Sequence, residues 1–538
     1  MKKISIKLAM LTGILMMTVG HAYAYLSTGN TYGDISVPCN SDGTPNTVLS
    51  PGDNTVCVQV AGASAPKSLG AELALDFLTT SLSNTTIYHY IITGGATPLG
   101  NPPSFSATNG MVYTVGSGDL NVWTGVGNSI SGASGKPIIL SFAALHSMDG
   151  YGRLACQNSS SYTGIQVLPP QTYYTDYCAS GANYGLAIPM SSAPGVAYND
   201  TSEPQIDFAN TTCTTTTQKN YVNYAGNTIP VTELSGCSNA GVRMMATTVG
   251  ASDVLAGTYN NTGPSLAFTH ALTNAPLTNA PSFFIPFQLA VTSTLIYTNP
   301  KTGVQQQGVL SRDQVQSLFN NPSNIPTWSK IPGFDGNTQK VFVCMRLAGS
   351  GTKANFNSNL MKGVAEYTNS LYQGGANYAF NFTGTDMKNC ITSPPAGYAA
   401  IGYINADSLP AYPSSLGSSG SLNGIALEGV LPHNDPNYTD AKATVRDMVY
   451  PYMTQEQLVT RTAGDPAIDA DQTSFIAAFE SAAVNGQYLV PPPSGGIFAA
   501  GAFWVAPGDM CAVRSNTDQS PFTMKLATTA NGATCPIK

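Results

Sequence analysis

The hydrophobic and polar positions of this chain alternate between strand-like and helix-like spacings. The apolar run Val56–Val60 predicts a buried strand. The segment 67–82 predicts a helix, because Leu69, Leu73 and Phe77 recur every four residues and share one face. Further segments of the same kinds are strands at 284–299, 399–404 and 449–459, helices at 311–319 and 474–483, and a strand, glycine loop and helix across 338–364.

Strands that alternate with helices are typical of an α/β fold with a mostly parallel sheet and helices on both faces. The helix at 311–319 carries its own start signal, because Ser311 and Gln314 have the spacing of a capping box. The segment 235–255 predicts a helix followed by a strand or turn. We therefore expect the α/β class.

Residues 83–235 have a different character. They are rich in Gly, Ser, Thr and Asn, and their apolar runs are short, as at Ile138–Ala143. Such a composition suits strands and loops. We expect this range to be a β-rich, disulfide-bonded insertion.

The first residues have the pattern of a secretory signal. Lys2, Lys3 and Lys7 precede the apolar run Leu8–Val19, and an A-x-A site ends at Ala24. We expect residues 1–24 to be a signal peptide and the protein to be periplasmic or secreted. No later run is long and apolar enough to cross a bilayer, so no membrane span is expected.

Composition and charge narrow the class of partner. Charged residues make up only 9% of the chain and the formal net charge is −7, which argues against nucleic acid as a partner. Hydrophobic residues make up 42%, which argues against disorder. An anionic ligand would have to be held by local dipoles and a few placed cations.

The ten cysteines form an even number after an export signal, which indicates disulfides. Spacing alone does not fix their connectivity. Their clustering favours neighbour pairing, as Cys39–Cys57, Cys156–Cys178, Cys213–Cys237, Cys344–Cys390 and Cys511–Cys535. Metal binding is the alternative, but the chain has no CxxC pair and only five histidines. We expect no metal and no cofactor.

Three segments share the order strand, small-residue turn, helix: 62–66, 238–241 and 349–352. A helix N-terminus presents free backbone N–H groups and a partial positive charge, which suits an oxyanion. An ordinary helix cap is the alternative for any one of them. Arg346 precedes the third turn, and its guanidinium can hold two oxygens of a tetrahedral anion. Asp253 can accept a hydrogen bond from an anion that still carries a proton, such as monohydrogen phosphate, and would repel sulfate.

These motifs, in this order, resemble the phosphate-binding proteins of bacterial phosphate ABC transporters. The matching segments are AGASAP (61–66), CSNAGVR (237–243), GASD (250–253) and RLAGSGT (346–352). The resemblance implies a two-lobed periplasmic-binding fold of type II, an anion held between the lobes, and an ABC transporter permease as a candidate partner. Lobe one would comprise 25–295, with the insertion 83–235, and 448–538; lobe two would comprise 296–447.

Carried over position by position, the resemblance implies the phosphate ligands Ser64, Ala65, Ser238, Asp253, Arg346, Ser350, Gly351 and Thr352. One departure concerns the arginine, because the acidic residue that the family has two places after it is Ala348 here. The insertion and the cysteine content are also atypical.

Two other functions compete with phosphate capture. An extracellular surface or adhesion protein could reuse the same fold, and the low charge and many disulfides favour that interpretation. A secreted phosphohydrolase is the other, but the chain contains neither an HExxH nor a GxSxG motif. Its histidines after the signal, His89, His146, His270 and His433, are scattered. We expect a binding protein and no enzyme.

Overall fold

A computed structural model describes much of the chain after residue 55. The described residues are 56–63, 73–81, 87–92, 105–106, 110–111, 120–126, 137–145, 147, 150–151, 154, 202–206, 213–223, 226–237, 242–246, 248–256, 258, 277–346, 350–362, 364, 366, 375–381, 384–406, 422–433, 435–438, 440–461, 470–485, 505, 508, 510–514, 523–525 and 535. The predicted signal peptide lies outside them.

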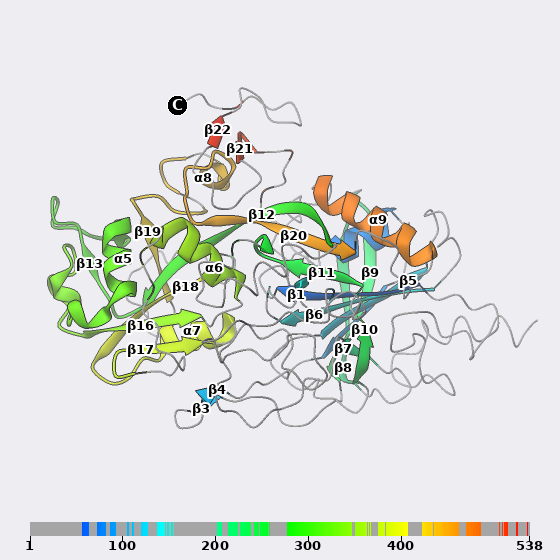
Figure 1. Ribbon diagram of the computed structural model, residues 1–538, viewed down its shortest axis with the longest axis horizontal. Helices are drawn as coiled ribbons and strands as arrows, with labels where there is room; N and C mark the ends of the chain where they lie inside the picture. Colours follow the sequence, from blue (N-terminus) through cyan, green and yellow to red (C-terminus); the bar gives the residue numbers. More distant parts are fainter. Residues whose placement is uncertain are drawn as a thin grey trace, which may run out of the picture.

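One large sheet organises the described part of the chain, as Figure 1 shows. In order across this sheet, the strands are β17 (Tyr378–Asn381), β16 (Lys340–Arg346), β18 (Tyr398–Asn405), β12 (Leu277–Thr292), β20 (Met453–Arg461), β11 (Val249–Ser252), β1 (Val56–Ala63), β6 (Pro137–Leu145), β5 (Leu120–Val126), β2 (Ile87–Ile92), β9 (Thr228–Cys237) and β8 (Cys213–Val222); β19 (Leu422–Leu427) pairs with β12, and β15 (Val309–Leu310) pairs with β19.

The α/β class is confirmed, but the expectation of a mostly parallel sheet was wrong. Strand β1 is parallel to both β6 and β11, and β16 is parallel to β17 and β18. Strand β12, however, is antiparallel to β18, β19 and β20. Strands β8 and β9 follow each other across residues 223–227 as a hairpin, and a hairpin forces antiparallel pairing.

Strand β12 joins two groups of strands. Its first part, Leu277–Pro286, pairs with β20, and its last part, Phe287–Thr292, pairs with β18 and β19. A strand of 16 residues spans about 50 Å at 3.3 Å per residue. Figure 1 shows β12 and β20 running from the group with β1, β6 and β11 to the group with β16, β17 and β18.

The described residues within 83–235 lie mostly in strands, and part of them belongs to the central sheet. Strand β6 pairs with the whole of β1, from Val56 opposite Ile138 to Ala63 opposite Leu145. The run Ile138–Phe142 is buried, and these apolar residues fill the core beside β1. Residues 137–145 thus form part of the central sheet.

The helix expected near the start of segment 235–255 is not found in its described residues. Residues 228–237 form β9, and Val242–Ala246 form strand β10, which pairs antiparallel with β7 (Ser202–Ile206). A partner strand from a distant part of the chain thus overrides a local helical pattern. This removes the helix N-terminus that was expected to follow Ser238.

The positions of the other helices agree better with those predicted from the sequence. Helix α5 (Arg312–Asn320) has the predicted capping box: Gln314 N–H donates to the Ser311 hydroxyl at 3.2 Å, and Ser311 N–H donates to the Gln314 side chain at 2.7 Å. Residues 73–76 are helical and Phe77–Ser81 continue as a π-helical turn. The remaining helices are α6 (Gly351–Phe356) with a π-helical continuation at Asn357–Met361, α7 (Gly384–Thr392), α8 (Ala443–Arg446) and α9 (Ala470–Asn485).

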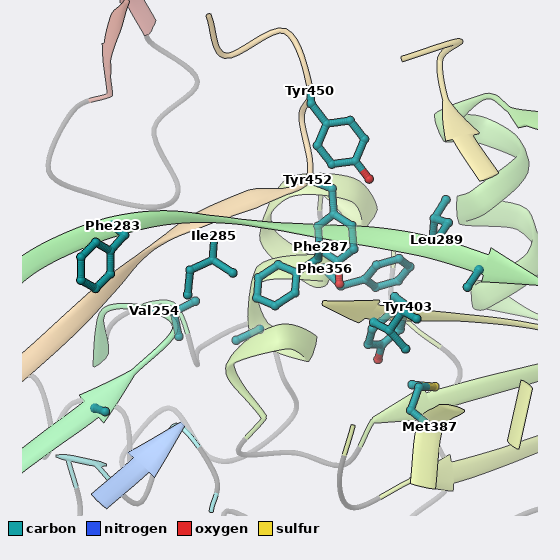
Figure 2. Close-up of a cluster of buried hydrophobic side chains, with 14 of the residues drawn as sticks. Val254, Phe283, Ile285, Phe287, Leu289, Phe356, Met387, Tyr403, Tyr450 and Tyr452 are labelled. Atoms are coloured by element: carbon teal, nitrogen blue, oxygen red, sulfur yellow. The ribbon is translucent and has the colours of Figure 1, made fainter. Parts of the chain in front are cut away.

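Buried aromatic side chains pack α6 against the sheet (Figure 2). The rings of Phe356 and Tyr403 stack with their centroids 4.3 Å apart, and Tyr452 lies 5.7 Å from Phe356 and 5.3 Å from Phe287. All four side chains are buried. Aromatic pairs of this kind contribute about 0.5–1.5 kcal/mol each beyond their buried area. Phe356 is the last residue of α6, so these contacts hold the C-terminal end of that helix against β18 and β12.

The disulfides Cys344–Cys390 and Cys511–Cys535 are present as predicted. Cys213 is disulfide-bonded and lies opposite Cys237 in the β8–β9 pairing. The predicted pairs Cys39–Cys57 and Cys156–Cys178 involve side chains outside the described part. Within the described residues, no helix has the length and apolar character to cross a membrane.

Candidate functional site

Close backbone packing brings the ends of β1, β6 and β11 together. Gly62 has a φ of +132°, and a side chain on Gly62 or Gly150 would collide with the backbone of Ala251. A side chain on Gly250 would in turn collide with Gly150. Only glycine permits this approach. It places the residue that follows β6 by two positions, Ser147, next to the residue after β11, Asp253.

The Ser147 side chain links the two groups of strands. Its hydroxyl donates to Oδ2 of Asp253 at 2.9 Å and accepts the backbone N–H of Gly351 at 3.1 Å. Ser147 and Asp253 are 3% and 2% exposed. The contact therefore joins the first turn of α6 to the ends of β6 and β11.

The first turn of α6 adds a hydroxyl and requires a glycine. Thr352 donates to Oδ2 of Asp253 at 3.4 Å. A Cβ on Gly351 would lie 2.7 Å from the Cβ of Asp253, so the helix can approach only because residue 351 has no side chain. Ser350 is the N-cap: its hydroxyl accepts the backbone N–H of Lys353 at 3.3 Å.

Arg346 is the last residue of β16 and lies near the Ser147–Asp253 contact. It is 4% exposed, and burial lowers the pKa of its guanidinium, while the Tyr403 and Asp253 side chains act in the opposite direction. Its backbone N–H donates to the Tyr403 hydroxyl at 3.0 Å. A buried guanidinium is costly unless anionic groups compensate it, so this position favours negative charge nearby.

A buried ion pair between Lys353 and Glu366 helps to fix the positions of Arg346 and α6. Lys353 forms a salt bridge with Glu366, and the Tyr403 hydroxyl donates to the other oxygen of Glu366 at 2.9 Å. Burial lowers the pKa of Lys353, and the Glu366 carboxylate in contact with it opposes that shift. Glu366 thus holds Tyr403, which in turn holds the backbone of Arg346.

Two buried carboxyl groups share the site. Burial raises the pKa of Asp253 to about 6, against the opposing effects of the Ser147 hydroxyl and the Arg346 charge. Glu456 on β20 is 1% exposed, and the pairing of β11 with β20, which sets Gln457 opposite Ser252, brings it into contact with Asp253. Burial, the Asp253 charge and that contact raise the pKa of Glu456 well above its ordinary value.

The structure brings together part of the predicted ligand set. Asp253, Arg346, Gly351 and Thr352 cluster, with Ser350 at the cap of the same helix. Ser64, Ala65 and Ser238 lie outside the described residues, so their roles stay predictions.

Two site residues were missed by the sequence analysis. Ser147 lies in the stretch HSMDG after the apolar run 137–145, and the small-residue turn after a strand was the signal that could have identified it. Glu456 carries no local signal, because it is one of four consecutive polar residues, 454–457, in β20. Among the described residues, no group of three or more His, Cys, Asp or Glu side chains is arranged to hold a metal ion.

No protein-family model matches the chain, and no curated protein matches it. Several solved structures resemble part of it. An ABC-type phosphate transport receptor from Vibrio cholerae is 16% identical, with a TM-score of 0.28 over 48% of this chain and 84% of that one. PstS from Borrelia burgdorferi is 14% identical, with a TM-score of 0.25 over 48% and 83%. A DING protein is 15% identical, with a TM-score of 0.32 over 54% and 86%. At these scores the likeness establishes no function for this chain.

Proposed function

We propose that the protein binds a phosphate-like oxyanion between Ser147 and Asp253 on one side and Arg346 and the start of α6 on the other. One observation carries the proposal: a buried guanidinium, a buried carboxylate, two hydroxyls and a helix N–H converge from distant segments. In the structure these groups contact one another directly, so an anion would have to take over the hydrogen bond between Ser147 and Gly351; the set could then surround a small tetrahedral anion with donors and offer it one acceptor.

The acceptor decides which anion fits. Apart from the neighbouring carboxyl of Glu456, no described residue is placed to donate to Oδ1 of Asp253, and a carboxylate oxygen can accept two hydrogen bonds. An anion that carries a proton can donate to this carboxylate, whereas sulfate at neutral pH cannot and would be repelled. The proposed ligand is therefore monohydrogen phosphate or a similar protonated oxyanion, and the site binds it without chemical turnover.

The two sides of the site belong to the two groups of strands that β12 and β20 connect. We propose that these groups correspond to lobes 25–295 with 448–538, and 296–447, and that an anion bound between them favours a closed arrangement. Closure would be a hinge motion at the two connecting strands. Export to the periplasm or beyond, and delivery to an ABC transporter permease, belong to the same proposal.

Thermal unfolding in the presence of inorganic phosphate tests this function. A ligand that binds only the folded protein stabilises it by about 2.7 kcal/mol at a hundred times its Kd. We expect phosphate to raise the Tm of the wild-type protein and to leave the Tm of an Arg346→Ala variant unchanged. An equal shift in both proteins, or a shift in neither, would contradict the proposed site.

A further inference from the structure

Glu456 is placed to act on the anion site through Asp253. Residues 454 and 456 lie on the same face of β20, because side chains alternate along a strand. The Thr454 hydroxyl donates to the backbone oxygen of Asp253 at 2.6 Å, so this face points at Asp253. β20 is also hydrogen-bonded to β11, with Gln457 opposite Ser252, which fixes the register beside the site.

The contact between the two carboxyls requires a proton. With both groups ionised, neither oxygen of Glu456, nor Oδ1 of Asp253, receives a hydrogen bond from any described residue. Leaving three buried carboxylate oxygens without donors would cost several kcal/mol. A hydrogen bond between the two adjacent side chains would remove much of this cost, and it can form only if one carboxyl is protonated.

We propose that Glu456 is a specificity-determining residue of the anion site: as a neutral acid it donates to Asp253, and the site takes up its anion only while the two carboxyls share one proton. This inference rests on the proposed anion site and adds a regulation to it. Glu456 acts by setting the charge of Asp253 and need not touch the anion.

The charged and titratable groups around the two carboxyls determine whether a rise in pH strengthens or weakens anion binding. Arg346, at the end of β16, is the cation that faces Asp253. Tyr452, just before β20, lies close enough to Asp253 for the carboxylate charge to raise the Tyr452 pKa. Ser147 and Thr352 contribute hydroxyls. Asp386 on α7 acts on Arg346. With one shared proton, the pair carries a single negative charge that Arg346 balances.

Raising the pH removes the shared proton and leaves two negative charges opposite one arginine. The site then repels an anion, so affinity is lost on the alkaline side. Lowering the pH through the pKa of Asp253, about 6, protonates that carboxylate as well. The site then loses its acceptor for a protonated anion and no longer discriminates against sulfate.

A ligand-free measurement tests the shared proton. At neutral pH, infrared spectroscopy of the wild-type protein should show the carbonyl stretch of a protonated carboxyl, and Glu456→Gln should abolish it. Glu480→Gln is the matched control, because Glu480 on α9 is another carboxyl whose pKa burial raises. Absence of the band, or its survival in Glu456→Gln, would overturn the proposal whether or not the protein binds phosphate.

The coupling to the ligand is tested by the Kd for inorganic phosphate at a series of pH values. The Glu456→Gln variant keeps an amide donor for Asp253 but has no ionisable proton at that position. The wild-type affinity, divided by that of Glu456→Gln, should fall about tenfold per pH unit on the alkaline side, as for one coupled proton. Parallel profiles would overturn the coupling. If neither protein binds phosphate at any pH, the proposed function itself fails, while the infrared band still decides whether the proton is shared.

Discussion

The Ser147 hydroxyl lies 2.9 Å from Oδ2 of Asp253 and joins two segments 106 residues apart. The same hydroxyl accepts the Gly351 N–H at 3.1 Å, across 204 residues. One small side chain thus connects β6, β11 and α6. An anion at this position would take over hydrogen bonds that Ser147 and Gly351 now make to each other and to Asp253.

Replacing Ser147 by alanine should weaken phosphate binding. A hydrogen bond to a charged group contributes about 1.5–3 kcal/mol, so the Kd should rise roughly tenfold or more. Ser317→Ala is a matched control, because the Ser317 hydroxyl is exposed on α5 and donates to the Asp313 backbone oxygen. Equilibrium dialysis with phosphate measures both variants, and equal Kd values for Ser147→Ala and the wild-type protein would exclude Ser147 from the site.

The geometry of the guanidinium should matter as well as its charge. Lysine keeps the positive charge at position 346 but lacks the planar fork, so Arg346→Lys should still lose about 2 kcal/mol of binding, or roughly 30-fold in Kd. Arg446→Lys is the control, since Arg446 forms its ion pairs with Asp440 and Asp447 around α8. Phosphate binding by Arg346→Lys at the wild-type level would show that Arg346 does not hold the anion.

Asp253 should make the stability of the ligand-free protein depend on pH. Its pKa is raised from 3.8 to about 6 in the folded state, so between these values the folded protein binds the proton more tightly than the unfolded chain. Stability is therefore lost as the pH rises through this window, by about 3 kcal/mol. Urea unfolding from pH 4 to 7 should show this decline in the wild-type protein and a smaller one in Asp253→Asn; identical slopes would contradict the burial of an ionisable Asp253.

The Lys353–Glu366 pair should behave as one unit. Lys353→Met leaves the Glu366 carboxylate buried without its cation, and Glu366→Gln leaves the ammonium buried, so each single change should cost about 3–5 kcal/mol of unfolding free energy. The double variant should be more stable than either single one, because no lone charge remains. Denaturant unfolding of all four proteins measures the coupling; additive single effects would show that the two side chains do not interact.

Local sequence signals predicted the secondary-structure elements, whereas contacts between distant segments determine which residues form the site. The capping box of Ser311 and Gln314 and the strand–turn–helix around Arg346 were readable because their partners are within a few residues. The segment after Ser238 was misread, because Val242–Ala246 take a strand partner at 202–206 that no local pattern reveals.

Ser147 and Glu456 were not predicted, because contacts between distant segments place them at the site. Ser147 matters because the glycines at 62, 150 and 250 let three strand ends approach, and Glu456 matters because β20 returns beside β11. Sheet register, not residue type, places both beside Asp253. Asp253 itself was predicted from the resemblance of its GASD segment to the phosphate-binding proteins and from its capacity to accept a hydrogen bond from a protonated anion, and the structure shows it buried.

Calorimetric titration of the wild-type protein with inorganic phosphate and with sulfate at pH 7 tests the anion site most directly. Convergence of Arg346, Asp253, Ser147 and the first turn of α6 predicts one saturable phosphate site per chain, with sulfate binding at least about tenfold more weakly because it cannot donate to the carboxylate. A protein that shows no saturable heat with phosphate, or that binds sulfate as tightly as phosphate, would contradict the account.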